Sequence, residues 1–261
     1  MISTKFNKLV STIQGYRKVA IAFSGGVDST LLLYAARIAL GKKNVVALNL
    51  LTTVNSKITI ANSRSIIETH FGGEILYKEI EADPLEWGRF TANTEERCYF
   101  CKKQMYSLLL DAMKEYSCDL LLDGTNVNDK EEGRPGLKAI AELNVKTPLL
   151  DAGLTKTEIR ALSQENGLVN HDLPSNSCLA TRIPTGQNIT QKLLQEIENA
   201  EAFLNSLGFD GCRVRPLTSH AVVELQEKHL IEAISIEKRH KIESFFSTST
   251  LGLPALGFKG R

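Results

Sequence analysis

The feature that most constrains the fold is a glycine-rich turn between an apolar run and an amphipathic run near the start of the chain. Residues 18–23 (KVAIAF) suit a strand buried on both faces, and residues 29–40 have the apolar density of a packed helix. Between them, Gly25 and Gly26 allow a sharp backbone turn that brings N–H groups close to an anion. The following helix directs the positive end of its dipole at the same place. The sequence therefore predicts a phosphate-binding turn.

The side chains of this turn suit a nucleotide but not the transfer of its terminal phosphate. Hydroxyl groups come from Ser24, Ser29 and Thr30, and Asp28 is placed either to cap the helix or to hold Mg²⁺ bound to phosphates. The turn matches neither the Walker pattern, with its lysine, nor G-x-G-x-x-G. The missing lysine indicates chemistry elsewhere on the nucleotide. The alternative is an ordinary capped turn without a ligand.

Strands and helices alternate through the first part of the chain, which predicts an α/β fold with a parallel sheet. The region 124–148, rich in glycine and charge, predicts a long functional loop. A later helix and three short apolar stretches predict a small separate α/β domain, so we expect domains at 1–175 and 176–261. The predicted strands are 18–23, 45–50, 74–80 and 119–123, with later ones near 214, 222–225 and 251–258. The predicted helices are 29–40, 56–71, 101–116, 155–166 (opened by a Thr155/Glu158 capping box) and 190–207.

Charge and composition exclude several classes of protein. The 261 residues include 31 basic and 30 acidic side chains, a balance that disfavours nucleic-acid binding. No apolar run approaches the ~20 residues of a membrane span, and the amphipathic N-terminus is unlike a signal peptide. We therefore expect a cytoplasmic protein. Its five cysteines then favour metal or catalytic thiols over a disulfide framework.

Three of the cysteines are candidates for chemistry. Cys98 and Cys101 form the C-x-x-C of ERCYFCKK, and a zinc ribbon would need a second pair. Together with Cys178 they would suit a [4Fe–4S] cluster that leaves one iron open. The alternatives for the pair are surface thiols or a redox dithiol. Cys118 and Cys212 we expect to be structural.

The SGGVDS turn resembles the PP-loop of ATP pyrophosphatases, which cleave ATP between its α and β phosphates. With ERCYFCKK, DGTNVNDKEEGRPGLKAIAEL, PLLDAGLTKTEIRALSQENGL, LPSNSCLATRIPTG and CRVRP, nearly the whole chain resembles the LarE family of sulfur transferases. The resemblance implies an adenine nucleotide α-hydrolase-like (Rossmann-like) domain, with helices on both faces of a parallel sheet. It also implies a small C-terminal α/β domain for substrate binding or oligomerisation, and a homo-oligomer.

The resemblance also implies a reaction. ATP with Mg²⁺ would adenylylate a carboxylate of pyridinium biscarboxylate mononucleotide, pyrophosphate would leave, and sulfur would displace AMP to give a thiocarboxylate for the nickel-pincer nucleotide of lactate racemase. In one branch of the family the cysteine matching Cys178 gives up its own sulfur and becomes dehydroalanine. In the other, three cysteines hold an oxygen-labile [4Fe–4S] cluster that delivers sulfide. Because Cys98 and Cys101 are present, this chain matches the cluster branch. A sulfur donor and other cofactor-biosynthesis proteins are the implied partners.

The resemblance assigns roles to individual residues. Cys98, Cys101 and Cys178 would be the catalytic, cluster-binding set, Asp28 would hold Mg²⁺, and Glu201 would contact a metal. The residues implied in ATP binding are Ser24, Gly25, Gly26, Asp28, Ser29, Thr30, Gly124, Thr125, Asn126 and Asp129. Those implied in binding substrate anions are Arg134, Lys138, Arg182, Arg213 and Arg215, the last two on one face of a strand.

Three other functions compete with this one. A PP-loop tRNA thiolase would also use ATP and cysteines, but it would need a basic surface that a net charge of +1 does not favour. An amidotransferase-like synthetase would need an ammonia source, and the sequence contains no glutaminase domain. A non-enzymatic nucleotide-binding module would bind ATP without releasing pyrophosphate.

Overall fold

The computed structural model describes residues 2–133, 135–174 and 177–257. The chain forms two compact units, which are described separately below. The first consists of residues 1–52, 57–83 and 96–173, and the second of residues 53–56, 84–95 and 174–261.

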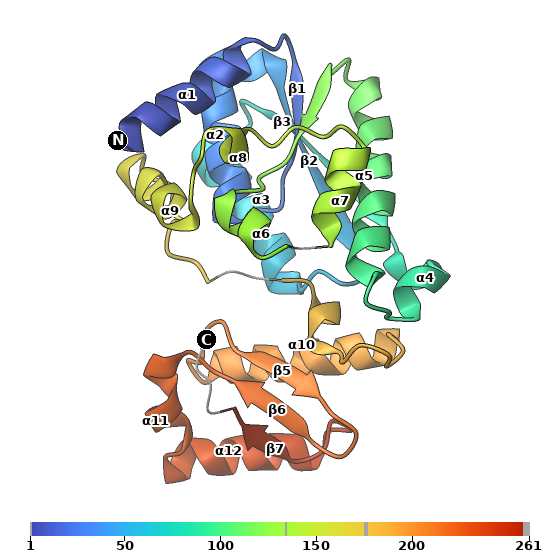
Figure 1. The fold of residues 1–261 in the computed structure, drawn as a ribbon. Helices are drawn as coiled ribbons and strands as arrows, with labels where there is room; N and C mark the ends of the chain where they lie inside the picture. The colour runs from blue at the N-terminus through green and yellow to red at the C-terminus, as the bar shows by residue number, and fades with distance from the viewer. Residues whose placement is uncertain (1, 134, 175–176, 258–261) are drawn as a thin grey trace. The chain divides into compact units, whose positions relative to one another are not determined.

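A four-stranded parallel sheet forms the centre of the first unit (Figure 1). Its strand order is β3-β2-β1-β4, and the register pairs Val19 with Val45 on one side and with Leu120 on the other. The prediction of an α/β fold with a parallel sheet is confirmed. The strands are β1 (Val19–Ala22), β2 (Val45–Thr52), β3 (Leu76–Ala82) and β4 (Leu120–Leu122).

Helices cover both faces of this sheet because β1 is apolar on both. Val19 and Ile21 pack into one hydrophobic cluster, and Ala20 packs with Leu121 into another. The first cluster includes buried side chains of α1 (Ile2–Gln14), α2 (Val27–Leu40), α3 (Lys57–Phe71), α8 (Pro148–Asp151) and α9 (Lys156–Glu165). The second includes side chains of α5 (Arg97–Glu115) and α7 (Gly136–Glu142). Figure 1 shows the two helix layers on opposite sides of the strands.

The strand order contains a switch point that locates a binding site. The chain leaves β1, builds β2 and β3 on one side, and then returns to place β4 on the other side of β1. In open parallel sheets, ligands bind at the carboxyl ends of the two strands where the order reverses. The turns after β1 and β4, which begin at Phe23 and Asp123, therefore face the expected site.

The predicted long loop at 124–148 is wrong, because much of this region is helical. It contains α6 (Val127–Glu131) and α7, followed by α8. Helix α6 begins with a capping box in which the Asn126 side chain accepts from the Asp129 backbone and the Asp129 side chain accepts from the Asn126 backbone. The density of charge and glycine concealed this start signal. The capping box predicted for Thr155 and Glu158 is confirmed.

The second unit contains a three-stranded mixed sheet, so the small separate sheet predicted from the sequence is confirmed. Its strands β5 (Arg213–Pro216) and β6 (Ala221–Glu224) are antiparallel, and β7 (Pro254–Leu256) pairs parallel with β6. Phe209 and Phe246 are fully buried in its core. Its helices are α4 (Gly88–Thr91), α10 (Gln191–Ser206), α11 (Leu230–Ala233) and α12 (Ile236–Ser247). Short 3-10 turns occupy 42–44 in the first unit and 84–86, 179–182 and 227–229 in the second.

Among the residues that the structure describes, no helix combines the length and the apolar character that crossing a membrane requires.

The environment of His70, at the end of α3, predicts that the stability of the first unit depends on pH. Its Nε2 accepts a hydrogen bond of 2.9 Å from the Val169 backbone N–H, which only the neutral ring can do. Burial, and then the charge of Arg37, lowers the pKa of His70; Arg37 is also 3.8 Å from Glu74. The unfolded chain therefore binds this proton more readily than the folded one. The contribution of neutral His70 to the free energy of unfolding is present in full above about pH 6.5 and is lost as the pH falls below that value.

We therefore expect His70→Gln to flatten the pH dependence of stability between about pH 5 and 7. The measurement is urea unfolding, followed by circular dichroism, across that range. His240→Gln, at an exposed position of α12, is the control and should keep the wild-type slope. Equal slopes in all three proteins would contradict the assignment.

Candidate functional site

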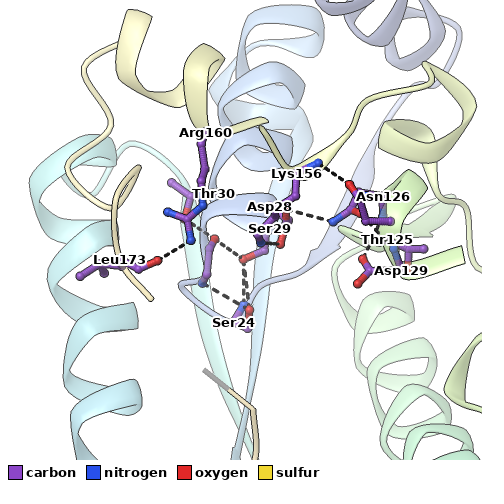
Figure 2. A network of polar contacts seen from close by, with 12 residues as sticks. Ser24, Asp28, Ser29, Thr30, Thr125, Asn126, Asp129, Lys156, Arg160 and Leu173 are labelled. Atoms are coloured by element: carbon purple, nitrogen blue, oxygen red, sulfur yellow. Dashed lines mark hydrogen bonds and ion pairs between the residues drawn. The ribbon is translucent and has the colours of Figure 1, made fainter. Parts of the chain in front are cut away.

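The turn after β1 is built as a set of backbone donors ringed by hydroxyl groups. Gly26 is the N-cap of α2 in an extended conformation, with no side-chain cap. The Ser29 hydroxyl donates to the Gly26 carbonyl at 3.0 Å and lies 3.2 Å from the Ser24 hydroxyl. Figure 2 shows these side chains around the start of α2. Asp28 is thus not the N-cap of this helix, and its role in holding Mg²⁺ stays a prediction.

Gly25 is required by both conformation and space. Its φ is +73°, which L side chains rarely adopt. A Cβ at this position would lie 2.6 Å from the Ser63 Cα on α3. The turn is thus pressed against a neighbouring helix, which fixes its shape before any ligand arrives.

The segment after β4 lies beside this turn, as the switch point requires. A Cβ on Gly124 would be 3.1 Å from the Ser29 N and 3.3 Å from the Asp28 Cβ. The Asn126 Nδ2 donates to Asp28 Oδ1 at 3.3 Å. The structure therefore brings Gly124 and Asn126 to the glycine-rich turn, where the sequence placed them. Their part in ATP binding stays a prediction.

A lysine that the sequence analysis missed stands at the same place. Lys156, the first residue of α9, forms an ion pair with Asp28 (Figure 2). Burial raises the pKa of Asp28, and the Lys156 ammonium opposes that rise. The Lys156 backbone N–H donates to Asn128 Oδ1 at 2.8 Å, which ties α9 to α6. The turn has no lysine of its own, but the fold supplies one from 128 residues away.

One signal in the sequence points to this lysine. A cation in the first turn of a helix opposes the helix dipole. Lys156 directly follows the N-cap Thr155, whose capping box with Glu158 marks the helix start. A misplaced charge beside a recognisable cap indicates a role other than helix stability.

A buried polar network supports the turn after β4. Asp123 is 6% exposed, accepts hydrogen bonds from the Tyr106 hydroxyl and from the Thr125 hydroxyl and backbone, and lies 3.7 Å from Lys102 Nζ. Burial alone would raise the pKa of Asp123, but Lys102 and the hydrogen bonds lower it below its ordinary value. The network joins the 124–126 turn to α5, where Lys102 follows Cys101. From the sequence, Asp123 is predicted only as the last residue of a strand.

The C-x-x-C pair lies on the first turns of α5, which begins at Arg97, earlier than predicted. Cys98 and Cys101 are both half-buried, and residues three apart on a helix share a side of it. The Arg97 guanidinium donates to Cys98 Sγ at 3.4 Å. The pair thus fits two neighbouring metal ligands. Across residues 2–133, 135–174 and 177–257, no three Cys, His, Asp or Glu side chains gather to hold a metal ion.

Cys178 belongs to the second unit, and Arg182 holds the backbone around it. The Arg182 guanidinium donates to the Cys178 carbonyl at 3.1 Å and to the Ser177 carbonyl at 2.8 Å. It also forms a bidentate pair with Glu201 at 2.8 and 3.0 Å, and its side chain is 2% exposed. Glu201 Oε1 further accepts from the Val214 backbone at 3.0 Å. The two residues predicted to meet a substrate anion and a metal here pair with each other.

The remaining predicted anion-binding residues lie on different elements of the two units. Arg213 and Arg215 share a face of β5, as their alternation indicated, and Arg215 pairs with Glu224 at 2.6 Å. Lys138 is exposed on α7, with Nζ 5.2 Å from the centre of the Tyr99 ring. Arg134 lies outside the described residues. Cys118 and Cys212 are buried, in keeping with the structural role expected for them.

The contact of Gly25 with α3 predicts a difference between two glycines of nearly equal φ. Gly73 has φ +71°, and a Cβ added there would meet nothing within 4 Å, so Gly73→Ala carries only the backbone strain of about 1–2 kcal/mol. Gly25→Ala adds the collision with Ser63 and should lower the free energy of unfolding further. It should also abolish ATP binding, measured by titration calorimetry. An equal loss of unfolding free energy in the two variants would contradict a steric role for the Gly25–Ser63 contact.

Comparison with known proteins places the chain in a family. The family described as NAD synthase matches residues 2–87. A pyridinium-3,5-bisthiocarboxylic acid mononucleotide synthase of Lactiplantibacillus plantarum is 33% identical over 237 residues, covering 88% of this chain and 82% of that protein. Uncharacterised proteins of Synechocystis sp. (over 230 residues) and Methanocaldococcus jannaschii (over 231) are each 31% identical, covering 88% of this chain and 84% and 85% of theirs. Because the first of these relatives is matched over most of its length, the chain belongs to the LarE family of sulfur transferases, with an NAD synthase-like PP-loop domain.

Proposed function

We propose that the protein is an ATP-dependent sulfur transferase that converts a carboxylate of pyridinium biscarboxylate mononucleotide into a thiocarboxylate. The observation that carries the proposal is the ion pair between Asp28 of the PP-loop and Lys156 of α9, at the switch point of the sheet. The name of the L. plantarum relative supplies the substrate class. The three cysteines supply a route for sulfur.

The first step is activation of the carboxylate. A substrate carboxylate oxygen attacks the α-phosphorus of ATP, the α–β bridging bond breaks, and pyrophosphate leaves with its electron pair. The backbone donors of Gly25 and Gly26 and the hydroxyls of the loop would hold the β and γ phosphates. Magnesium bound to the phosphates would take Asp28 as a ligand, and Lys156, released from that carboxylate, would turn to the phosphates.

The second step replaces AMP with sulfur. A sulfur nucleophile attacks the acyl carbon, the acyl–oxygen bond breaks, and AMP leaves. A [4Fe–4S] cluster held by Cys98, Cys101 and Cys178 would supply a sulfide on its open iron. In the alternative route the Cys178 Sγ attacks the acyl carbon and AMP leaves. A base then removes the Cα proton of Cys178 as its Cβ–Sγ bond breaks, so the sulfur leaves with the acyl group as the thiocarboxylate and Cys178 becomes dehydroalanine. The C-x-x-C pair on α5 favours the first route.

Arg182 and Glu201 would position Cys178 rather than bind substrate. Nearly all of the Arg182 donors already meet the backbone around Cys178 or the Glu201 carboxylate. An ion pair this buried is costly to break, so we propose that it fixes the cysteine-bearing segment. Arg213, Arg215 and Lys138 remain our candidates for substrate phosphate and carboxylate contacts. We further propose residues 176–261 as the substrate-binding and oligomerisation domain of a homo-oligomer.

The direct test is anaerobic incubation with ATP, Mg²⁺, sulfide and the biscarboxylate mononucleotide. We expect AMP and pyrophosphate release that depends on the substrate, and a thiocarboxylate product in the mass spectrum. Pyrophosphate release that ignores this substrate and responds to tRNA would instead indicate a tRNA thiolase. ATP binding without any pyrophosphate release would indicate a nucleotide-binding module.

Lys156→Gln tests the phosphate role of the lysine. Removal of a charge-assisted hydrogen bond should lower kcat/KM for ATP by about 10- to 100-fold. Lys130→Gln, at an exposed position of α6, is the matched control and should behave as wild type. An unchanged kcat/KM in Lys156→Gln would leave the Asp28–Lys156 pair with a purely structural role.

The cysteines give opposite expectations for the two sulfur routes. On the cluster route, anaerobically purified wild type carries iron, Cys98→Ser loses it, and the Cys178 peptide keeps its mass after many turnovers. Cys118→Ala, at a buried position, controls for loss of a thiol elsewhere. Iron-free protein that turns over repeatedly with sulfide would contradict the cluster. Loss of hydrogen sulfide from the Cys178 peptide, with one turnover per chain, would establish the sacrificial route.

A further inference from the structure

The glycine-rich loop is held from its inner side by a segment that neither the sequence motifs nor the proposed reaction assigns. This segment, residues 168–173, follows α9 and is here called the strap. Asn170, in the middle of the strap, is fully buried. Its Nδ2 donates to the Gly25 carbonyl at 3.0 Å and to the Thr30 hydroxyl at 2.9 Å. A residue 145 positions from Gly25 in the sequence thus contacts both the turn and the first turn of α2.

The orientation of the Asn170 amide follows from its partners. The Thr30 hydroxyl donates its proton to the Gly26 carbonyl at 2.9 Å, so its oxygen accepts from Asn170. The Gly25 carbonyl can only accept. Both contacts therefore need the amide nitrogen, and the Oδ1 atom is left buried with no hydrogen-bond partner among the described residues. A site that leaves one atom unsatisfied to make two contacts with the loop indicates that those contacts matter.

The Gly25 carbonyl controls the direction of a phosphate-facing donor. A trans peptide is planar, so the Gly25 C=O and the Gly26 N–H point in opposite directions. Asn170 holds the carbonyl toward the interior, and the Gly26 N–H then points away from the interior. Gly26 is exposed, and its N–H makes a long contact of 3.4 Å with the Ser24 hydroxyl. The Gly26 N–H is thus oriented toward the surface, where it can donate to an anion.

The strap is itself fixed at four further positions. Arg160 on α9 donates to the His171 carbonyl at 2.5 Å and to the Leu173 carbonyl at 2.7 Å, the second contact being drawn in Figure 2. His70 accepts from the Val169 backbone, and Leu168 is 1% exposed in the core. These anchors keep Asn170 in place, so that it can hold the loop rather than follow it.

We propose that Asn170 is a positioning residue that presets the PP-loop for the phosphates of ATP, with Arg160 securing the strap that carries it. The proposal deepens the proposed function, because it rests on ATP phosphates binding at the PP-loop. A preset donor strengthens binding of the ground state and of the transition state alike. Its loss should therefore raise KM for ATP and leave kcat nearly unchanged.

Asn170→Leu tests this, because leucine matches the size of asparagine but cannot donate. We expect KM for ATP, and the Kd of a non-hydrolysable ATP analogue with Mg²⁺, to rise about tenfold while kcat stays within about twofold. Asn166→Leu is the matched control. Asn166 caps the end of α9 through a 2.7 Å contact with the Leu162 carbonyl, and its variant should keep the wild-type KM.

Arg160→Lys is the second variant, since it leaves Asn170 in place and loosens the strap from its other side. It should also raise KM for ATP, by less than Asn170→Leu, and this result decides the matter if Asn170→Leu does not fold. A fall in kcat at unchanged KM would show a merely structural role and overturn the proposal, as would analogue binding equal to wild type in both variants. Analogue binding by the wild type is a separate readout and decides whether the PP-loop binds ATP at all.

Discussion

The adjacency of β1 and β4 is the constraint on which the candidate site depends. Because the chain builds β2 and β3 on one side and returns on the other, two turns far apart in sequence share the carboxyl edge of the sheet. One turn contributes Gly25 and Gly26, pressed against Ser63 of α3. The other contributes Asn126, which reaches Asp28. Without this strand order, neither turn would find the other.

At this edge of the sheet, another element supplies the positive charge that the loop itself lacks. In kinases and P-loop enzymes a lysine near the loop neutralises the phosphates that react. Here the lysine arrives from the first turn of α9 and is stored against Asp28. Charges held in this way can exchange partners when a magnesium-bound nucleotide enters, because each finds a stronger partner of opposite sign. In the proposed reaction, the attack of the substrate carboxylate, and not the lysine, sets the cleavage point at the α–β junction.

Local signals in the sequence predicted much of the fold. The apolar run before Gly25, the strand–helix alternation and the Thr155–Glu158 box each depend on neighbouring residues, so a single sequence reveals them. The helices α6 and α7 were missed because glycines and charged residues are dense in the segment 124–138, where both helices begin, although Asn126 and Asp129 form a capping box.

The contacts that organise the site are long-range, and the sequence did not disclose them. Lys156 meets Asp28 across 128 residues, and Asn170 meets Gly25 across 145. Lys156 left a trace, as a cation at the wrong end of a helix, whereas Asn170 left none. Arg182 and Glu201 carry the charges expected of ligand-binding residues, yet they pair with each other in the interior of the second unit. A charged residue type alone cannot distinguish those two uses.

In the proposed reaction, activation at the PP-loop and sulfur transfer, which needs Cys178 on either route, are separate steps. The most direct test is exchange of labelled pyrophosphate into ATP by Cys178→Ser, in the presence of the biscarboxylate mononucleotide. We expect this variant to catalyse substrate-dependent exchange at close to the wild-type rate but to make no thiocarboxylate. Thiocarboxylate formation by Cys178→Ser at the wild-type rate, or loss of exchange in a folded variant, would contradict this expectation.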